Sequence, residues 1–487
     1  MSLKKLSLLC LLATSFTPPL QAKPHEWLQA KPHEWLLTNF SLLDVEQGRL
    51  LSGKQLAIDE GRISAIEDSS AKLTAERNVD LQGGILMPSL WDMHVHFEGR
   101  ELVEDNALLL PLYLSYGITA VREAASDLAP EVLLWRKQIE SGNRLGPKIF
   151  SAGQKFEGPD SVWNGDLEVA DGAEMRQGMD KLESMAVDFI KITENTMPAA
   201  LYLETLKEAR ARGHLVSSHI PYGVSIFEAA KSGLSSIEHA SYVLRLGNAQ
   251  EPQIAAAVAA GRMSTKQASQ AYRDGFDPEQ AQLGYRMLAA KGVAVTPTLI
   301  GGHQLAWLDT QDHSQDPFMA FLTRAFTEKY RWRIERMGAQ TPQQWQTRKQ
   351  HYQALAAELP KLLQAGVTLL AGSDSAALNT YVYPAEGLHT ELQLWQQAGV
   401  NNADILRSAT INGARFMGQS KDYGSIEVGK KAELLWLQDN PLQDIGATQS
   451  IRGLFYRGTL FDSKALDAMR TEAAESVRLL DNARRQL

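Results

Sequence analysis

The sequence predicts an α/β fold built around a (β/α)8 barrel of the TIM type. Between residues 85 and 374, short runs of β-forming apolar residues alternate with stretches of helical periodicity. Such alternation is typical of parallel strands joined by crossover helices. Eight such runs with their helices make eight β/α units that span about 330 residues, and eight is the repeat number of this barrel, whose active site lies at the carboxyl ends of its strands.

The elements follow in order along the chain. Ahead of the barrel, residues 36–51 and 54–66 read as short strands with glycine-containing turns, and a second strand-rich block covers 424–460. Two long helical insertions near 244–290 and 304–360 follow the sixth and seventh barrel strands, where they are expected to form a lid. The final segment, 464–487, is expected to be a helix. The eight expected barrel strands are 85–96, 118–123, 148–152, 188–192, 215–219, 236–239, 293–299 and 367–374.

Composition restricts the class of protein. The chain has 487 residues, of which 44% are hydrophobic and 22% charged, as in a globular protein with a large core. The net charge is -8, so a broad basic surface for nucleic acid is not expected. The oligomeric state is not set by the sequence, and a homo-oligomer stays open.

The amino-terminal segment reads as a signal peptide over residues 1–22. Two lysines precede an apolar run at 6–16, and Leu20-Gln21-Ala22 resembles a cleavage site, so a periplasmic or secreted protein is expected. A buried amino-terminal helix is the alternative. No other stretch has the length of a membrane span. Residues 21–28 recur at 29–36, and we assign this tandem repeat no function.

Cysteine usage bears on the metal ligands that the protein can offer. The chain has one cysteine, Cys10, which lies inside the expected signal peptide. The mature protein would therefore form no disulfide, and any metal ion must be held by nitrogen and oxygen ligands.

A His-x-His motif, Asp92-Met93-His94-Val95-His96, ends the first expected barrel strand. Residues i and i+2 of a strand point to the same face, so His94 and His96 can bind one ion together. An isolated motif of this kind is weak evidence, because such a pair also arises by chance among 11 histidines. Its position at a strand end strengthens the prediction of a metal site.

Four further polar side chains occur at the ends of other expected strands. Lys191 ends the fourth, His219 the fifth, His239 the sixth and Asp374 the eighth. Taken singly, the lysine could pair with an acid, each histidine could be a hydrogen-bonded core residue, and Asp374 could cap a helix. Taken together at one rim of a barrel, they predict a site for divalent metal, with zinc as the first choice.

On these motifs the sequence resembles the amidohydrolase superfamily, and above all its secreted members related to imidazolonepropionase and to metal-dependent prolidases and carboxypeptidases. The resemblance covers nearly all of the mature chain. It implies a barrel domain at 87–420 and a small β-sandwich domain formed from both ends of the chain, at 37–86 and 421–463. The matching segments are 84–96, 116–122, 188–192, the two histidine strands, 371–375, 409–415 and 424–430.

The resemblance also implies a centre of two divalent metal ions. His94 and His96 would bind one ion, His219 and His239 would bind the other, and Lys191 would be carbamylated by CO2 to bridge both. Asp374 would complete the first site and act as the catalytic proton carrier. Carbamylation converts the amine into an anionic ligand, and two metal ions lower the pKa of a water molecule and polarise a carbonyl.

The predicted function is metal-dependent hydrolysis of an amide or peptide bond in a small substrate, such as a dipeptide or an N-acyl amino acid. A cyclic amidase, a lactone or ester hydrolase, and a non-catalytic periplasmic metal-binding protein are the alternatives. His303, Tyr222, Tyr242 and Arg122 are candidates for substrate binding. His303 could equally be a solvated loop residue, and for Arg122 a structural ion pair is the stronger interpretation.

Overall fold

The structure is a computed structural model that describes residues 32–486. The expected signal peptide and most of the tandem repeat lie outside the described residues. Among residues 32–486, no helix combines the length and apolar character that crossing a membrane requires.

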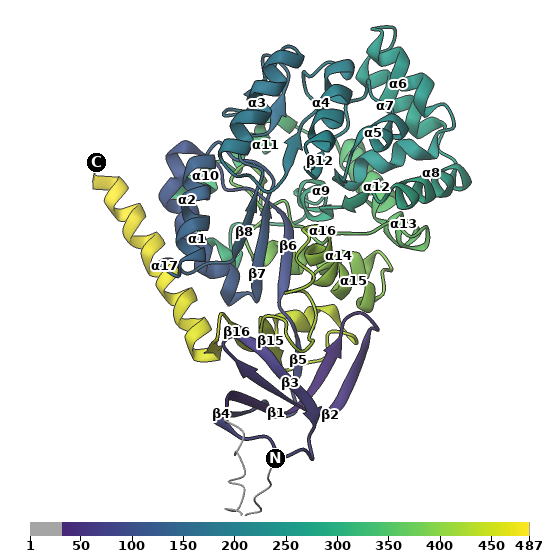
Figure 1. The fold of residues 1–487 in the computed structure, drawn as a ribbon. Coiled ribbons are helices and arrows are strands. Elements are labelled where there is room, and N and C mark those ends of the chain that lie inside the picture. Colours follow the sequence, from purple (N-terminus) through teal and green to yellow (C-terminus); the bar gives the residue numbers. More distant parts are fainter. Residues whose placement is uncertain (1–31, 487) are drawn as a thin grey trace, which may run out of the picture. The chain divides into compact units, whose positions relative to one another are not determined.

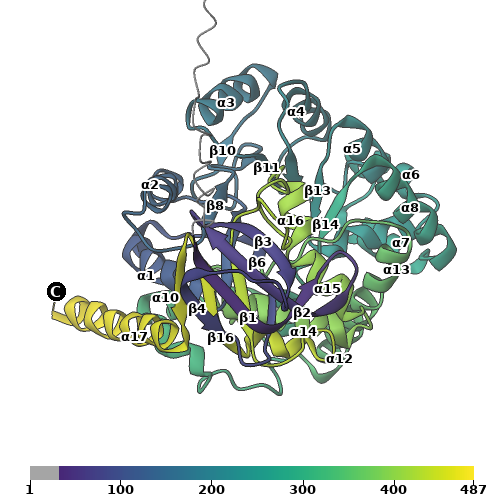
Figure 2. The same ribbon diagram turned by 60° about the horizontal axis from the view of Figure 1, so that its bottom comes forward.

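Both ends of the chain contribute to one mixed sheet of eight strands, in the order β17-β16-β15-β5-β1-β2-β3 with β4 paired to β1. The amino-terminal strands and the carboxyl-terminal strands join where β15 runs antiparallel to β5, with Leu434 opposite Pro88. Figure 1 shows these strands side by side beneath the remaining elements, and Figure 2, turned so that the bottom comes forward, shows them in front. The strands are β1 (His33–Asp44), β2 (Arg49–Asp59), β3 (Arg62–Asp68), β4 (Ala75–Asp80), β5 (Ile85–Pro88), β15 (Leu434–Leu437), β16 (Ile451–Tyr456) and β17 (Thr459–Asp462).

Local sequence explains this sheet. Glu60 and Gly61 both have positive φ, 51° and 68°, so they form the tight turn expected between β2 and β3. Alternate side chains of the strands are buried in a separate apolar cluster, whose members include Leu37, Leu56 and Leu86 from the amino-terminal half and Phe455 from the carboxyl-terminal half.

Two parallel sheets follow, with strand orders β6-β7-β8 and β10-β9-β11-β12-β13-β14. Seven of the expected barrel strands appear in them, although β11 to β14 contain only three residues each. The expected first strand, 85–96, is divided, because Ile85–Pro88 forms β5 of the mixed sheet and only Leu90–Val95 forms β6. Two short strands, β9 and β10, were not expected. The bounds are β6 (Leu90–Val95), β7 (Ile118–Glu123), β8 (Lys148–Ser151), β9 (Phe156–Glu157), β10 (Leu167–Glu168), β11 (Ile190–Ile192), β12 (Val216–Ser218), β13 (Ser236–Glu238) and β14 (Ala294–Thr296).

Hydrogen bonds link the two parallel sheets at both edges. Near β8, the Asp188 amide donates to the Ser151 carbonyl oxygen at 2.9 Å. At the opposite edge, segment 367–375 lies between β14 and β6, because the Val295 amide donates to Thr368 at 3.0 Å and the Met93 amide donates to Ala371 at 2.8 Å.

The prediction of a regular strand at 367–374 was wrong, since this segment forms only isolated bridges at Leu369 and Ser375. Two local features interrupt the ladder. Asp374 has a φ of 59°, and Gly372 lies so close to β6 that a Cβ there would stand 2.8 Å from the His94 amide nitrogen. The segment is therefore extended without continuous pairing, and it holds Asp374 against β6.

Helices connect the strands, and the two insertions are helical as expected. Thr341 and Gln344 form a capping box that begins α12, and Ser264 and Gln267 do the same for α7. The first insertion contains η2 (Ala240–Gly247), α6 (Glu251–Ala259), α7 (Thr265–Asp274) and α8 (Pro278–Lys291). The second contains α9 (Leu299–Ala306), η3 (Pro317–Phe321), α10 (Arg324–Glu328), α11 (Arg331–Met337), α12 (Pro342–Ala356) and α13 (Leu359–Gln364).

The last helix, α17 (Ser463–Gln486), lies along α1, as Figure 1 shows. Arg484 of α17 donates to both oxygens of the buried Asp105 of α1, at 2.6 and 2.7 Å. The remaining helices are η1 (Arg100–Leu102), α1 (Val103–Ser115), α2 (Ala129–Glu140), α3 (Gly172–Ser184), α4 (Ala199–Ala211), α5 (Ile226–Ser232), α14 (Glu386–Gln397), α15 (Asn402–Ser408), α16 (Ile411–Phe416) and η4 (Ile445–Gln449).

Candidate metal centre

The six side chains expected to bind metal come together at the carboxyl ends of the parallel strands. Two of them occupy backbone conformations that are unusual for residues other than glycine, with φ of 73° at His239 and 59° at Asp374. Such strain persists only where the surrounding structure enforces it, as it often does at functional sites. The six are His94 on β6, His96 just after it, Lys191 on β11, His219 after β12, His239 after β13, and Asp374 beyond segment 367–373.

Three ligand atoms form a triangle. The Nε2 atoms of His94 and His96 are 3.2 Å apart, and Oδ1 of Asp374 lies 3.3 Å from each of them. Two nitrogen ligands at about 2.05 Å from a tetrahedral ion are separated by ~3.3 Å. The triangle therefore has the dimensions of one face of a metal coordination shell.

His219 and His239 form a second pair. Their Nε2 atoms are 2.9 Å apart, and Nδ1 of His239 lies 3.9 Å from Oδ2 of Asp374. Asp374 therefore stands between the two histidine pairs. One histidine of each pair also lies close to this aspartate. Ligand atoms of His94, His239 and Asp374, one from each residue, all lie within 4.8 Å of one another.

Each of the four histidines of this centre has a hydrogen-bond partner at its Nδ1 nitrogen. Nδ1 of His94 faces Glu238 at 2.6 Å, and Nδ1 of His219 faces Glu194 at 2.5 Å. Nδ1 of His96 faces the carbonyl oxygen of Ala125 at 2.8 Å, and that of His239 faces the Thr298 hydroxyl at 2.6 Å. The two carboxylates and the Ala125 carbonyl can only accept, so they place the proton on Nδ1 of His94, His219 and His96 and leave the Nε2 lone pair directed inward, the tautomer that binds metal. The Thr298 hydroxyl can accept from His239 in the same way.

Electrostatics favour the same protonation state. Burial, assisted by the charge of Lys191, lowers the pKa of His94 to about 4. Burial also lowers the pKa of His239 well below its usual value. These imidazoles are therefore neutral near pH 7, and neutral imidazole is the form that coordinates a cation. The Nε2 atoms of His219 and His239 are 2.9 Å apart. When both are unprotonated, they repel each other unless a cation lies against both.

Lys191 is buried without a partner. Its side chain is 1% exposed, and among the described residues its Nζ has no hydrogen-bond partner. Burial lowers the pKa of this amine from 10.5 to about 8. A neutral amine is the form that reacts with CO2, and the resulting carbamate would give this orphaned position a charge suited to cations.

The expectation that Arg122 binds substrate is corrected by its surroundings. Arg122 and Glu238 are both fully buried, and one guanidinium nitrogen donates to both Glu238 oxygens at 2.8 Å. Glu238 also accepts from Ser217 at 2.7 Å and from His94. Arg122 thus forms a structural ion pair, the stronger of the two interpretations from the sequence. Glu238, to which the sequence assigned no role, orients the ring of His94 through its hydrogen bond to Nδ1.

The other three substrate candidates lie in different surroundings. Tyr242 lines the space beside His219 and donates to Glu194 at 2.7 Å. Tyr222 packs on Tyr272, with ring centroids 6.2 Å apart, and does not line the cavity bordered by His96, His219 and His239. His303 is not in a loop, because it lies on α9, where it is half-buried with its ring stacked 4.5 Å from that of Trp307. Of these three, Tyr242 alone reaches the space beside the metal site.

A small cavity of about 70 Å³ is lined by five of the six candidate ligand residues and shares lining residues with two larger spaces. We call the first the arginine chamber, a space of about 440 Å³ lined by Arg333 and Arg348. The second, of about 480 Å³, is lined by Trp163 and Trp332, and we call it the tryptophan chamber. The small cavity is lined by His96, Glu98, Lys155, Trp163, Lys191, Thr193, His219, His239, Arg333, Asp374, Ala376, Leu378 and Asn379.

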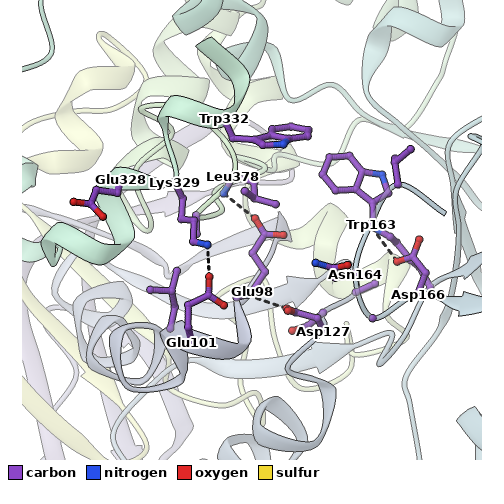
Figure 3. A pocket seen from close by; sticks show the side chains of 18 of the residues that line it. Glu98, Glu101, Asp127, Trp163, Asn164, Asp166, Glu328, Lys329, Trp332 and Leu378 are labelled. Atoms are coloured by element: carbon purple, nitrogen blue, oxygen red, sulfur yellow. Dashed lines mark hydrogen bonds and ion pairs between the residues drawn. The ribbon is translucent and has the colours of Figure 1, made fainter. Parts of the chain in front are cut away.

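Figure 3 shows the tryptophan chamber, with Trp163 and Trp332 on one side and carboxylates below them. The two indole rings are 5.3 Å apart between centroids. Glu98 accepts from the Leu378 amide at 2.8 Å and also lines the small cavity, so the chamber continues toward the metal site. Six carboxylates line this chamber against three cationic side chains.

A parallel α/β fold that presents four imidazoles, an aspartate and a buried lysine at its strand ends defines a class of protein equipped to bind divalent metal. More particularly, the chain belongs to the amidohydrolase family, because the sequence profile described as "Amidohydrolase family" matches residues 85–460.

Individual relatives are distant. Ochratoxinase from Aspergillus niger is 23% identical over 429 residues, which cover 75% of this chain and 72% of that protein. S-triazine hydrolase from Gordonia rubripertincta is 34% identical over 103 residues, which span only 21% of its length. The crystal structure of a Xaa-Pro dipeptidase matches with a TM-score of 0.63 and 19% identity, covering 88% of this chain and 99% of that one. At such identity, the structural match establishes the shared fold.

Proposed function

We propose that this protein is a hydrolase with two divalent metal ions that cleaves an amide or peptide bond of a small substrate, such as a dipeptide or an N-acyl amino acid. Residues 87–420 form its (β/α)8 barrel, and residues 37–86 and 421–463 form its small β-sandwich domain. The observation that carries the proposal is the 3.2–3.3 Å triangle of His94, His96 and Asp374 beside the second histidine pair.

The residues fit two ions. His94, His96 and Asp374 would hold one, and His219 and His239 would hold the other. Lys191, as a carbamate, would contact both, which accounts for its buried Nζ without a partner among the described residues. An all-nitrogen-and-oxygen set with four imidazoles suits zinc first, and other transition metals next. When bound, such ions lower the pKa of a water molecule and polarise a carbonyl group.

Asp374 is the group of this chain that moves a proton. Burial alone would raise its pKa, but His239, His94 and His96 around it lower that pKa well below the usual range. The carboxylate is therefore ionised and can accept a proton from the attacking water through Oδ2, the oxygen on the side of His239. The same oxygen then delivers that proton to the nitrogen of the departing amine.

The remaining residues position this chemistry. Glu238 and Glu194 orient the rings of His94 and His219 through hydrogen bonds to Nδ1. The pKa of Glu194 falls to about 2, because its interactions with His219 and the hydrogen bond from Tyr242 outweigh the effect of burial. The two chambers on either side of the small cavity suit a linear amide with two halves, which favours such a substrate over a compact lactone or cyclic amide.

A substrate screen tests the proposal. Purified protein loaded with zinc is incubated with a library of dipeptides and N-acyl amino acids, and released amine is measured. We expect hydrolysis of a subset of these compounds, loss of activity after chelation, and recovery on adding metal back. The Asp374→Asn variant should turn over the same compounds more slowly by on the order of 100-fold or more. A metal-loaded protein that hydrolyses none of them, or activity that survives chelation, would refute the proposal.

A further inference from the structure

The arginine chamber contains two cationic side chains without an acidic partner. Arg333 of α11 lines both this chamber and the small metal cavity, and its Nε donates to the Leu378 carbonyl oxygen at 2.8 Å. Arg348 of α12 lines the same chamber, and its Nε donates to Gln340 at 3.2 Å. No carboxylate of residues 32–486 lies within 4.0 Å of either guanidinium. Both groups are half-buried, so their charge is available to a ligand.

The chemistry of these side chains identifies the ligand group. In both arginines Nε is already committed, which orients the guanidinium plane and leaves terminal N–H groups to donate. A planar fork of this kind matches a carboxylate, with two parallel hydrogen bonds. Because Arg333 borders the metal cavity, a carboxylate on it would stand beside the bond that is cleaved.

The tryptophan chamber does not suit that carboxylate. Its six acidic side chains outnumber its cations by six to three, and Lys329 already pairs with Glu101 (Figure 3). The arginine chamber is also lined by two carboxylates, Glu194 and Asp374, but these already face His219 and His94 of the centre. A carboxylate would therefore be repelled more strongly in the tryptophan chamber, which favours one direction of binding for a linear substrate.

The walls of the arginine chamber restrict the side chain of the substrate residue that carries the carboxylate. They are mainly aliphatic and aromatic around the two guanidinium groups, so a residue with an apolar side chain is favoured there. These apolar walls include Leu299, Leu305, Tyr352, Leu355 and Val382.

We propose that Arg333 and Arg348 bind the free α-carboxylate of the substrate's carboxyl-terminal residue, and that this residue is apolar. This inference rests on the proposed function and deepens it. The substrate class becomes N-acyl or N-aminoacyl derivatives of apolar amino acids, and the amine product is the apolar amino acid.

Equilibrium binding tests the carboxylate site separately from catalysis. The probes are L-leucine and L-leucinol, which share a side chain and an amine and lack an amide bond, while leucinol has no carboxylate. Calorimetry on the zinc-loaded enzyme should show leucine binding at least about tenfold more tightly, the worth of charge-assisted hydrogen bonds. Equal affinities for the two probes would overturn the inference.

Variants locate the site. In Arg333→Met, the affinity for leucine should fall by about tenfold or more, with leucinol unchanged within about twofold, and Arg333→Lys should be intermediate because it keeps the charge and loses the fork. Arg348→Met should shift leucine in the same direction. Arg336→Met is the matched control, since Arg336 lies on the same helix α11, is exposed and lines neither chamber. Metal content and circular dichroism verify folding of each variant.

Turnover separates this inference from the proposed function. N-acetyl-L-leucine should be hydrolysed, and Arg333→Met should raise its KM far more than it lowers kcat. If leucine binding depends on Arg333 and no N-acyl amino acid or dipeptide is hydrolysed, the carboxylate site stands and the hydrolase proposal falls. If dipeptides are hydrolysed while Arg333→Met keeps its preference for leucine, the carboxylate site is wrong and the hydrolase stands.

Discussion

Glu238 offers the sharpest test of how the metal ligands are positioned. Its carboxylate is fully buried and accepts from Nδ1 of His94 at 2.6 Å, from Arg122 at 2.8 Å and from the Ser217 hydroxyl at 2.7 Å. In Glu238→Gln, the side chain keeps its size but replaces one acceptor oxygen with an NH2 group. That group faces the donors of Arg122 and His94, so hydrogen bonds turn into donor–donor contacts.

The size of the effect follows from this burial. Removing one partner of a buried ion pair costs about 3–5 kcal/mol, because the other charge stays buried and uncompensated. Loss of the hydrogen bond that orients a metal-binding histidine lowers metal affinity about 10- to 100-fold. We therefore expect Glu238→Gln to show both a lower free energy of unfolding without metal and weaker binding of zinc.

Urea unfolding of the metal-free protein and competition with a chelator measure the two effects. Glu228→Gln, at an exposed position of α5, is the matched control and should change the free energy of unfolding by less than about 0.5 kcal/mol. Adding Arg122→Met to Glu238→Gln should recover much of the stability, because no unpaired cation remains. If Glu238→Gln stays within about 1 kcal/mol of the wild type and binds zinc equally well, the assigned role of Glu238 is wrong.

Lys191→Ala should lose metal and nearly all activity, with partial rescue by short-chain carboxylic acids, whereas full activity in Lys191→Arg would exclude a carbamate at this position. Because burial lowers the pKa of Lys191 from 10.5 to about 8, the unfolded chain binds more protons between these values. Without metal and CO2, the free energy of unfolding of the wild type should therefore rise by about 3 kcal/mol relative to that of Lys191→Met as the pH rises through that window. If urea unfolding shows the same pH dependence of this free energy in both proteins, the prediction is wrong. Asp374→Asn should keep much of its metal while kcat falls on the order of 100-fold, whereas His94→Asn should lose metal first. Metal content measured beside kcat separates the two effects. Near-normal turnover in Asp374→Asn would exclude Asp374 from the mechanism.

The sequence predicted most of the fold, because long apolar runs and turn glycines report local structure directly. It failed where tertiary contacts overrule local pattern. Segment 367–374 has the composition of a strand, yet the close approach of Gly372 to β6 and the positive φ of Asp374 interrupt its pairing. The two-residue strands β9 and β10 are too short to leave any periodic signal.

The candidate ligands were visible in the sequence because each one ends an apolar run with the composition of a strand. Their supporting residues were not. Glu238 looks like one more polar residue beside His239, and its burial against Arg122 is apparent only from the fold. Arg333 and Arg348 lie on insertion helices whose position over the strand ends depends on long-range packing. No spacing in the sequence connects them with the metal site.

Counting metal ions tests the central claim most directly. The claim is that His94, His96, Lys191, His219, His239 and Asp374 form one centre for two ions. Zinc is measured by elemental analysis after gentle purification, reloading and removal of free metal, in the wild type and in His94→Asn and His219→Asn. The account predicts about two ions per chain in the wild type and fewer in each variant, since six ligand groups would be left partly unpaired around a single ion. A value near zero in the reloaded wild type, or equal metal content in all three proteins, would contradict it.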